Sequence, residues 1–87
     1  MVFEFQPRGV CSKLIQFDLS DDGKTINEMS FVGGCNGNLK AICKLVQGQD
    51  VDHVCELLAG NTCGGKNTSC ADQMTKGLRL AQAELAK

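Results

Sequence analysis

The 87-residue sequence contains no tryptophan and no tyrosine, so its four phenylalanines are its only aromatic residues. Single-stranded nucleic acids stack on aromatic side chains, and this composition supplies few such platforms. The sequence also lacks an excess of basic charge, because nine basic and ten acidic residues give a formal net charge of −1. A nucleic-acid surface usually needs clustered basic residues. We therefore expect no nucleic-acid partner.

Two kinds of segment are missing as well. No apolar run approaches the ~20 residues that a membrane-spanning helix needs. The first residues, 1–5, carry neither a basic flank nor a long apolar stretch, so no secretory signal is apparent. We expect a cytoplasmic protein with no membrane segment, in a compartment where thiols stay reduced. The length predicts a single domain over residues 1–87.

The apolar pattern predicts an α+β fold, with a small three-stranded antiparallel sheet followed by three helices. Alternation over residues 2–6 and apolar runs over 10–20 and 25–32 indicate the strands. The Asp-Gly pair between the last two strands tolerates the positive φ of a primed hairpin turn, so these strands should pair across it. Three stretches of apolar residues at helical spacing then indicate the helices. Each stretch is preceded by a residue of a type that caps helices, namely Asn38, Asp50 and Ser69.

The sequence contains an unusually high number of cysteines, namely six. In a reducing compartment, cysteines in a small domain favour metal or redox chemistry over structural disulfides. Two of them, Cys43 and Cys55, lie within helical apolar stripes. We interpret these two as small buried hydrophobic residues rather than ligands.

The other cysteines lie at element boundaries or in loops, beside glycine or polar residues: Cys11, Cys35, Cys63 and Cys70. Glycine lets the backbone turn several thiols toward one point. Two of the four lie near predicted helix N-termini, where exposed N–H groups favour the thiolate form that binds metals. Four thiolates match tetrahedral zinc or an iron–sulfur cluster. No CxxC pair is present, and a disulfide between Cys63 and Cys70 stays open as an alternative.

Residues 68–72, Thr-Ser-Cys-Ala-Asp, resemble the Thr-Ser-Cys-Pro-Asp signature of the TSCPD domain, with alanine in place of proline. Together with residues 33–39, Gly-Gly-Cys-Asn-Gly-Asn-Leu, they make the chain similar to the small stand-alone four-cysteine TSCPD family. The resemblance covers nearly the whole chain and places the shared cysteines of the family at the same four positions. Related domains lie near the C-terminus of many adenosylcobalamin-dependent ribonucleotide reductases, which implies such a reductase as a partner.

A more distant resemblance, from Val10 to the C-terminus, is to iron–sulfur scaffold proteins of the NifU N-terminal or IscU type. Residues 44–51, Lys-Leu-Val-Gln-Gly-Gln-Asp-Val, are similar to the joint between two scaffold helices. This resemblance implies a NifU/IscU-like fold and places three of the four cysteines at the scaffold's cluster ligands. Lys13 and Ser69 replace an acidic residue and a histidine of the scaffolds, and Cys63 would close the site with a fourth ligand. Closed four-ligand sites are more typical of structural zinc.

These patterns predict a metal-binding accessory domain, with zinc or an iron–sulfur cluster on four cysteines, and the TSCPD resemblance implies its association with ribonucleotide reductase. Two alternatives stay open: an iron–sulfur scaffold or carrier, and a thiol redox partner of the reductase that acts through Cys63 and Cys70. The partner is then the reductase or an iron–sulfur or redox protein. We predict no catalytic residue, because 87 residues cannot hold the radical-bearing barrel of a reductase. Any reductase activity would belong to the fused relatives.

Overall fold

The computed structural model describes residues 1–10, 12–33, 36–62 and 68–86. Its elements, in chain order, are β1 (Val2–Phe5), β2 (Ser12–Leu19), β3 (Ile26–Gly33), α1 (Asn36–Val46), α2 (Val51–Leu58) and α3 (Cys70–Leu85). The predicted α+β fold, a three-stranded antiparallel sheet followed by three helices, is confirmed. Among the described residues, no helix is both long and apolar enough to cross a bilayer.

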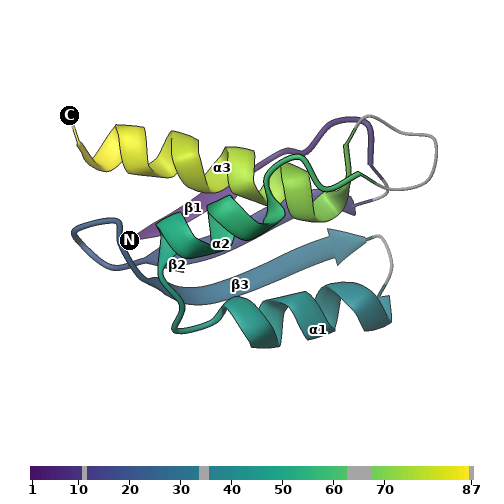
Figure 1. Ribbon diagram of the computed structural model, residues 1–87, viewed down its shortest axis with the longest axis horizontal. Coiled ribbons are helices and arrows are strands. Elements are labelled where there is room, and N and C mark those ends of the chain that lie inside the picture. The colour runs from purple at the N-terminus through teal and green to yellow at the C-terminus, as the bar shows by residue number, and fades with distance from the viewer. Residues whose placement is uncertain (11, 34–35, 63–67, 87) are drawn as a thin grey trace.

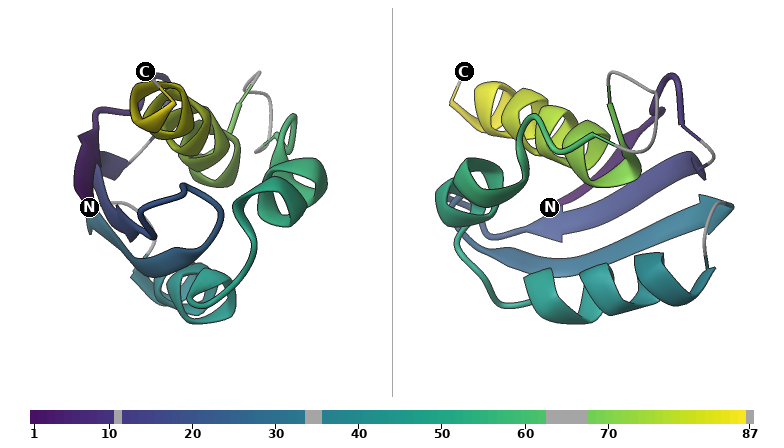
Figure 2. Two further views of the ribbon diagram at one scale, coloured as in Figure 1. Left: turned by 90° about the vertical axis from the view of Figure 1, so that its left-hand side faces the viewer. Right: turned by 45° about the vertical axis from the view of Figure 1, so that its right-hand side comes forward.

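The sheet has the order β1-β2-β3, and each strand is antiparallel to its neighbour. Figure 1 shows α1 beside β3 and α3 beside β1, and the end-on view in Figure 2 shows the helices gathered around one face of the sheet. Alternate residues of β2 point toward that face and are buried: Ile15, Phe17 and Leu19. They form a hydrophobic core with residues of β3 and all three helices, which include Met29, Val46, Val54, Met74 and Leu78.

The hairpin between β2 and β3 forms where it was predicted, but its turn is of another type. The N–H of Gly23 donates to the Ser20 carbonyl at 2.8 Å, and the N–H of Ser20 donates to the Thr25 carbonyl at 2.9 Å. Gly23 has a φ of +72°, whereas no non-glycine residue in the described ranges has a positive φ. The prediction of a primed turn is therefore wrong, because Asp-Gly at its centre needs positive φ at both residues. The Asp22 carboxylate instead accepts hydrogen bonds from the Ser20 hydroxyl and the Lys24 N–H, which stabilise a longer loop.

Two of the three predicted helix caps are confirmed. The Asp50 carboxylate accepts a hydrogen bond from the His53 N–H at 3.0 Å, and the Ser69 hydroxyl accepts one from the Asp72 N–H at 3.1 Å. Asn38 is not a cap, because α1 already begins at Asn36. Apolar spacing could not locate this start, since no apolar residue of the helix precedes position 39.

Main-chain hydrogen bonds tie the connection between α1 and α2 to the β2–β3 hairpin. The N–H of Gly48, which has a φ of +79°, donates to the Ile26 carbonyl at 2.6 Å. In return, the Ile26 N–H donates to the Gln49 carbonyl at 2.9 Å. The Val51 N–H donates to the Lys24 carbonyl at 2.8 Å. We call this region the hairpin end of the domain.

Candidate functional site

The predicted site consists of four cysteines, of which the structure describes Cys70. The other three, Cys11, Cys35 and Cys63, lie outside the described residues. The site can be followed through the described residues that adjoin them in sequence. These residues lie at the end of the molecule where β3 ends and where α1 and α3 begin, opposite the hairpin end (Figures 1 and 2). We call it the cysteine end.

The described neighbours of Cys11 and Cys35 are paired in the sheet. Ser12 directly follows the first of these cysteines, and Gly33 precedes the second by two residues. Ser12 and Gly33 are partners in the antiparallel ladder between β2 and β3. Two segments that are 21 residues apart along the chain thus meet at the cysteine end.

Ser12 also contacts the described cysteine. Its hydroxyl donates a hydrogen bond to Cys70 Sγ at 3.3 Å. The Ser12 side chain is buried, and Cys70 is half-buried as the first residue of α3. The start of β2 is therefore held against the N-terminus of α3 through a bond to sulfur.

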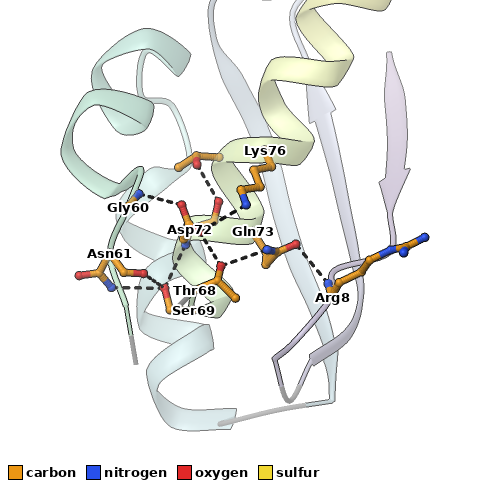
Figure 3. Close-up of polar contacts among 9 residues, drawn as sticks. Arg8, Gly60, Asn61, Thr68, Ser69, Asp72, Gln73 and Lys76 are labelled. Carbon is orange, nitrogen blue, oxygen red and sulfur yellow. Dashed lines mark hydrogen bonds and ion pairs between the residues drawn. The ribbon is translucent and has the colours of Figure 1, made fainter. Parts of the chain in front are cut away.

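Cys63 lies in the segment between Thr62 and Thr68. Asn61, just before this segment, is bonded to Ser69, the N-cap residue of α3 just after it. The Ser69 hydroxyl donates to the Asn61 carbonyl and accepts a hydrogen bond from Asn61 Nδ2 at 3.4 Å (Figure 3). The same hydroxyl caps α3. Asn61 lies two residues before Cys63, so this bond fixes the described chain next to the third cysteine.

Asp72, three residues after Ser69, binds residues on both sides of the segment that contains Cys63. Its buried carboxylate accepts hydrogen bonds from the Gly60 N–H at 2.7 Å and from the Thr68 hydroxyl, and Lys76 Nζ lies 3.8 Å away (Figure 3). The hydrogen bond from Thr68, followed by that from Gly60, lowers the pKa of Asp72 below its ordinary value. We define the anchoring cluster as Gly60, Asn61, Thr68, Ser69 and Asp72. The serine and aspartate of the Thr-Ser-Cys-x-Asp motif thus bind Asn61 and Gly60, and its threonine binds the aspartate.

Gln73 connects the anchoring cluster to the chain before Cys11. Its Nε2 donates to Thr68 Oγ1 at 3.0 Å, and its Oε1 accepts a hydrogen bond from the Arg8 N–H at 3.1 Å (Figure 3). The side chain is 6% exposed. Sequence reasoning missed both Gln73 and Ser12, because a polar residue in a strand or a first helical turn is usually solvated. The available signal was that Gln73 extends the Thr-Ser-Cys-x-Asp run by one residue.

Of the two cysteines predicted to be buried, one is buried in the core and the other is only partly buried. Cys55 is 2% exposed within the core, as predicted, and Cys43 is half-buried against it. Burial raises the pKa of both thiols, which favours their neutral form. Within the described ranges, no three histidine, cysteine, aspartate or glutamate side chains form a group that could hold a metal ion. Three of the four predicted ligands lie outside those ranges.

The fold and the anchoring cluster define a small α+β domain whose cysteine end is held together by side chains. The family model of the TSCPD domain matches residues 3–82. The chain therefore belongs to the TSCPD domain family, which confirms that part of the resemblance seen in the sequence. Neither a comparison with curated proteins nor one with solved structures found a match.

Proposed function

We propose that this TSCPD domain is a metal-binding accessory domain that holds one Zn²⁺ ion or an iron–sulfur cluster on four thiolates: Cys11, Cys35, Cys63 and Cys70. One observation carries the proposal, namely that described residues within two positions of each of the four cysteines are linked pairwise by hydrogen bonds or strand pairing. Ser12 pairs with Gly33 and donates to Cys70, and Asn61 binds Ser69. Described segments next to the four cysteines, from positions 12, 33, 61 and 69–70, thus lie at one end of the fold.

A closed set of four thiolate ligands is more typical of structural zinc than of a scaffold that transfers a cluster. Thiolate sulfur is a good ligand for zinc and for iron–sulfur clusters, and four thiolates complete a closed tetrahedral site. Structural zinc contributes apparent binding energies of about 10–16 kcal/mol in finger peptides. An 87-residue chain buries a small core, so a contribution on that scale would decide its stability.

The direct test is metal analysis of protein purified without oxygen. Cys70→Ser should lower both the bound metal per chain and the melting temperature, because it removes one ligand. Cys43→Ser is the matched control, since Cys43 lies half-buried on α1 and is not a proposed ligand. An unchanged metal content in Cys70→Ser would contradict the assignment of Cys70.

The same preparation separates the alternative functions. A scaffold or carrier that holds an iron–sulfur cluster would absorb visible light when purified anaerobically, and a zinc protein would be colourless. A thiol redox partner of a reductase would form a disulfide between Cys63 and Cys70, which peptide mapping without reductant would detect. Both thiols would instead stay reduced in a zinc site.

For the partner, we propose an adenosylcobalamin-dependent ribonucleotide reductase, or an iron–sulfur or redox protein that serves one, in the cytoplasm. Membership of the TSCPD family supports this proposal. The chain would act as an accessory domain and not as an enzyme on its own. Size-exclusion chromatography with a purified reductase that lacks its own C-terminal TSCPD region provides the test. Co-elution with this chain supports the reductase as partner, and separate elution contradicts it.

A further inference from the structure

Ser12 is buried on a strand position that should face solvent. The other buried residues of β2 are Ile15, Phe17 and Leu19, and strict alternation would place residue 12 on the opposite face. Ser12 is nevertheless only 4% exposed. Its burial therefore needs a local cause.

The cause is an irregularity in the ladder between β2 and β3. Leu14 is paired with Val32, and Ser12 is paired with Gly33, so Lys13 is an extra residue on β2. An extra residue of this kind reverses the alternation of side chains beyond it and is frequent next to functional sites. Gly33 has a φ of +79°, a conformation that glycine adopts without strain. The irregularity turns the Ser12 side chain toward α3.

The turned side chain meets a proposed metal ligand. We propose that Ser12 is a positioning residue, whose hydroxyl holds Cys70 Sγ by the hydrogen bond at 3.3 Å and strengthens metal binding by that sulfur. This inference rests on the proposed function, because it concerns one of the four ligands. Hydrogen bonds to a ligand atom fix its orientation and tune the metal, and their loss commonly weakens metal affinity by about 10–100-fold.

The experiment compares two side chains of the same shape at position 12. Ser12→Thr keeps the hydroxyl, whereas Ser12→Val replaces it with a methyl group, and both are β-branched residues that suit a strand. Co²⁺ titration reports the thiolate-to-cobalt absorption bands, and competition with a chelator measures the affinity for Zn²⁺. We expect Ser12→Val to bind Zn²⁺ at least about 10-fold more weakly than the wild type and to shift the cobalt bands. Ser12→Thr should retain most of the wild-type affinity and spectrum.

Ser30→Ala is the matched control, because Ser30 is an exposed serine of β3 whose hydroxyl lies 3.5 Å from a main-chain carbonyl. It should bind both metals like the wild type. Equal affinities and spectra for Ser12→Val and Ser12→Thr would overturn the role of Ser12 and leave the four-cysteine site intact. A wild-type protein that binds neither Zn²⁺ nor Co²⁺ would overturn the proposed function itself. Circular dichroism confirms that each compared variant is folded.

Discussion

Gly77 of α3 lies directly against the ring of Phe5 in β1. A Cβ atom at position 77 would lie 2.8 Å from Cγ and 3.0 Å from Cβ of Phe5, closer than such atoms normally approach. The absence of a side chain at this buried position is what allows α3 to approach the edge of the sheet. The same helix carries Cys70 and the anchoring cluster's Asp72, so its distance from the sheet also affects the cysteine end.

Gly77→Ala should therefore destabilise the domain, although alanine is the better helix former. Overpacking of this kind typically costs about 1–3 kcal/mol, against a gain of about 1 kcal/mol in helix propensity. Urea unfolding followed by circular dichroism measures the balance. Gly37→Ala is the control, because a Cβ at that position in α1 would lie within 4 Å of no described atom beyond its chain neighbours and its own helix backbone. It should leave the domain as stable as the wild type or slightly more so, and equal stabilities of the two variants would refute the close contact.

Asp72→Ala should destabilise the domain by removing the centre of the anchoring cluster. The Gly60 N–H and the Thr68 hydroxyl would each lose their acceptor. A buried group without its partner costs about 1–3 kcal/mol. Urea unfolding gives the difference in free energy. Asp21→Ala, in the exposed hairpin loop, should stay within about 0.5 kcal/mol of the wild type.

Acid should weaken the anchoring cluster through the same carboxylate. The hydrogen bond from Thr68 lowers the pKa of Asp72 in the folded state, so folding favours its ionised form. This contribution is present above the unfolded-state pKa of about 3.9 and is lost as the pH falls through the lower, folded-state value. Asp72→Asn cannot lose a proton there, so the stability difference from the wild type should shrink between pH 6 and about pH 3. A difference that stays constant over this range would contradict the prediction.

Removal of metal should lower the melting temperature of the zinc-loaded protein. A ligand at 100 times its dissociation constant stabilises the folded state by about 2.7 kcal/mol. In a domain of this size, each kcal/mol corresponds to a shift of about 4–8 °C. Differential scanning calorimetry with and without a chelator should therefore show a fall of at least about 10 °C. In Cys70→Ser the chelator should have a smaller effect, and an equal effect would show that Cys70 is not a ligand.

The fold could be predicted from the sequence because its signals are local. The alternation in β2, the helical spacing in α2 and the Asp50 and Ser69 caps each depend on residues close together in the chain. The turn type could not be predicted, because it depends on which backbone groups the Asp22 side chain binds. The start of α1 was missed because its first residues are polar or glycine.

The candidate site was predictable only in part. Cys70 and the motif around it are visible in the sequence, and the structure gives the motif its role in the anchoring cluster. Gly60 and Asn61 were missed, because most of their bonds are made by main-chain groups. Nearly every residue type has these groups, so the sequence does not reveal such bonds. Ser12 was missed because its orientation depends on pairing with Gly33, which lies far along the chain.

The two ends of the domain are closed by different kinds of bond. Main-chain hydrogen bonds of residues 24–26 and 48–51 join the hairpin end to the α1–α2 connection, whereas in the described part of the cysteine end the side chains of Ser12, Asp72 and Gln73 supply bonds between segments. A single substitution can therefore remove a bond that joins segments of the cysteine end, whereas every residue except proline keeps the main-chain donors that the hairpin end uses.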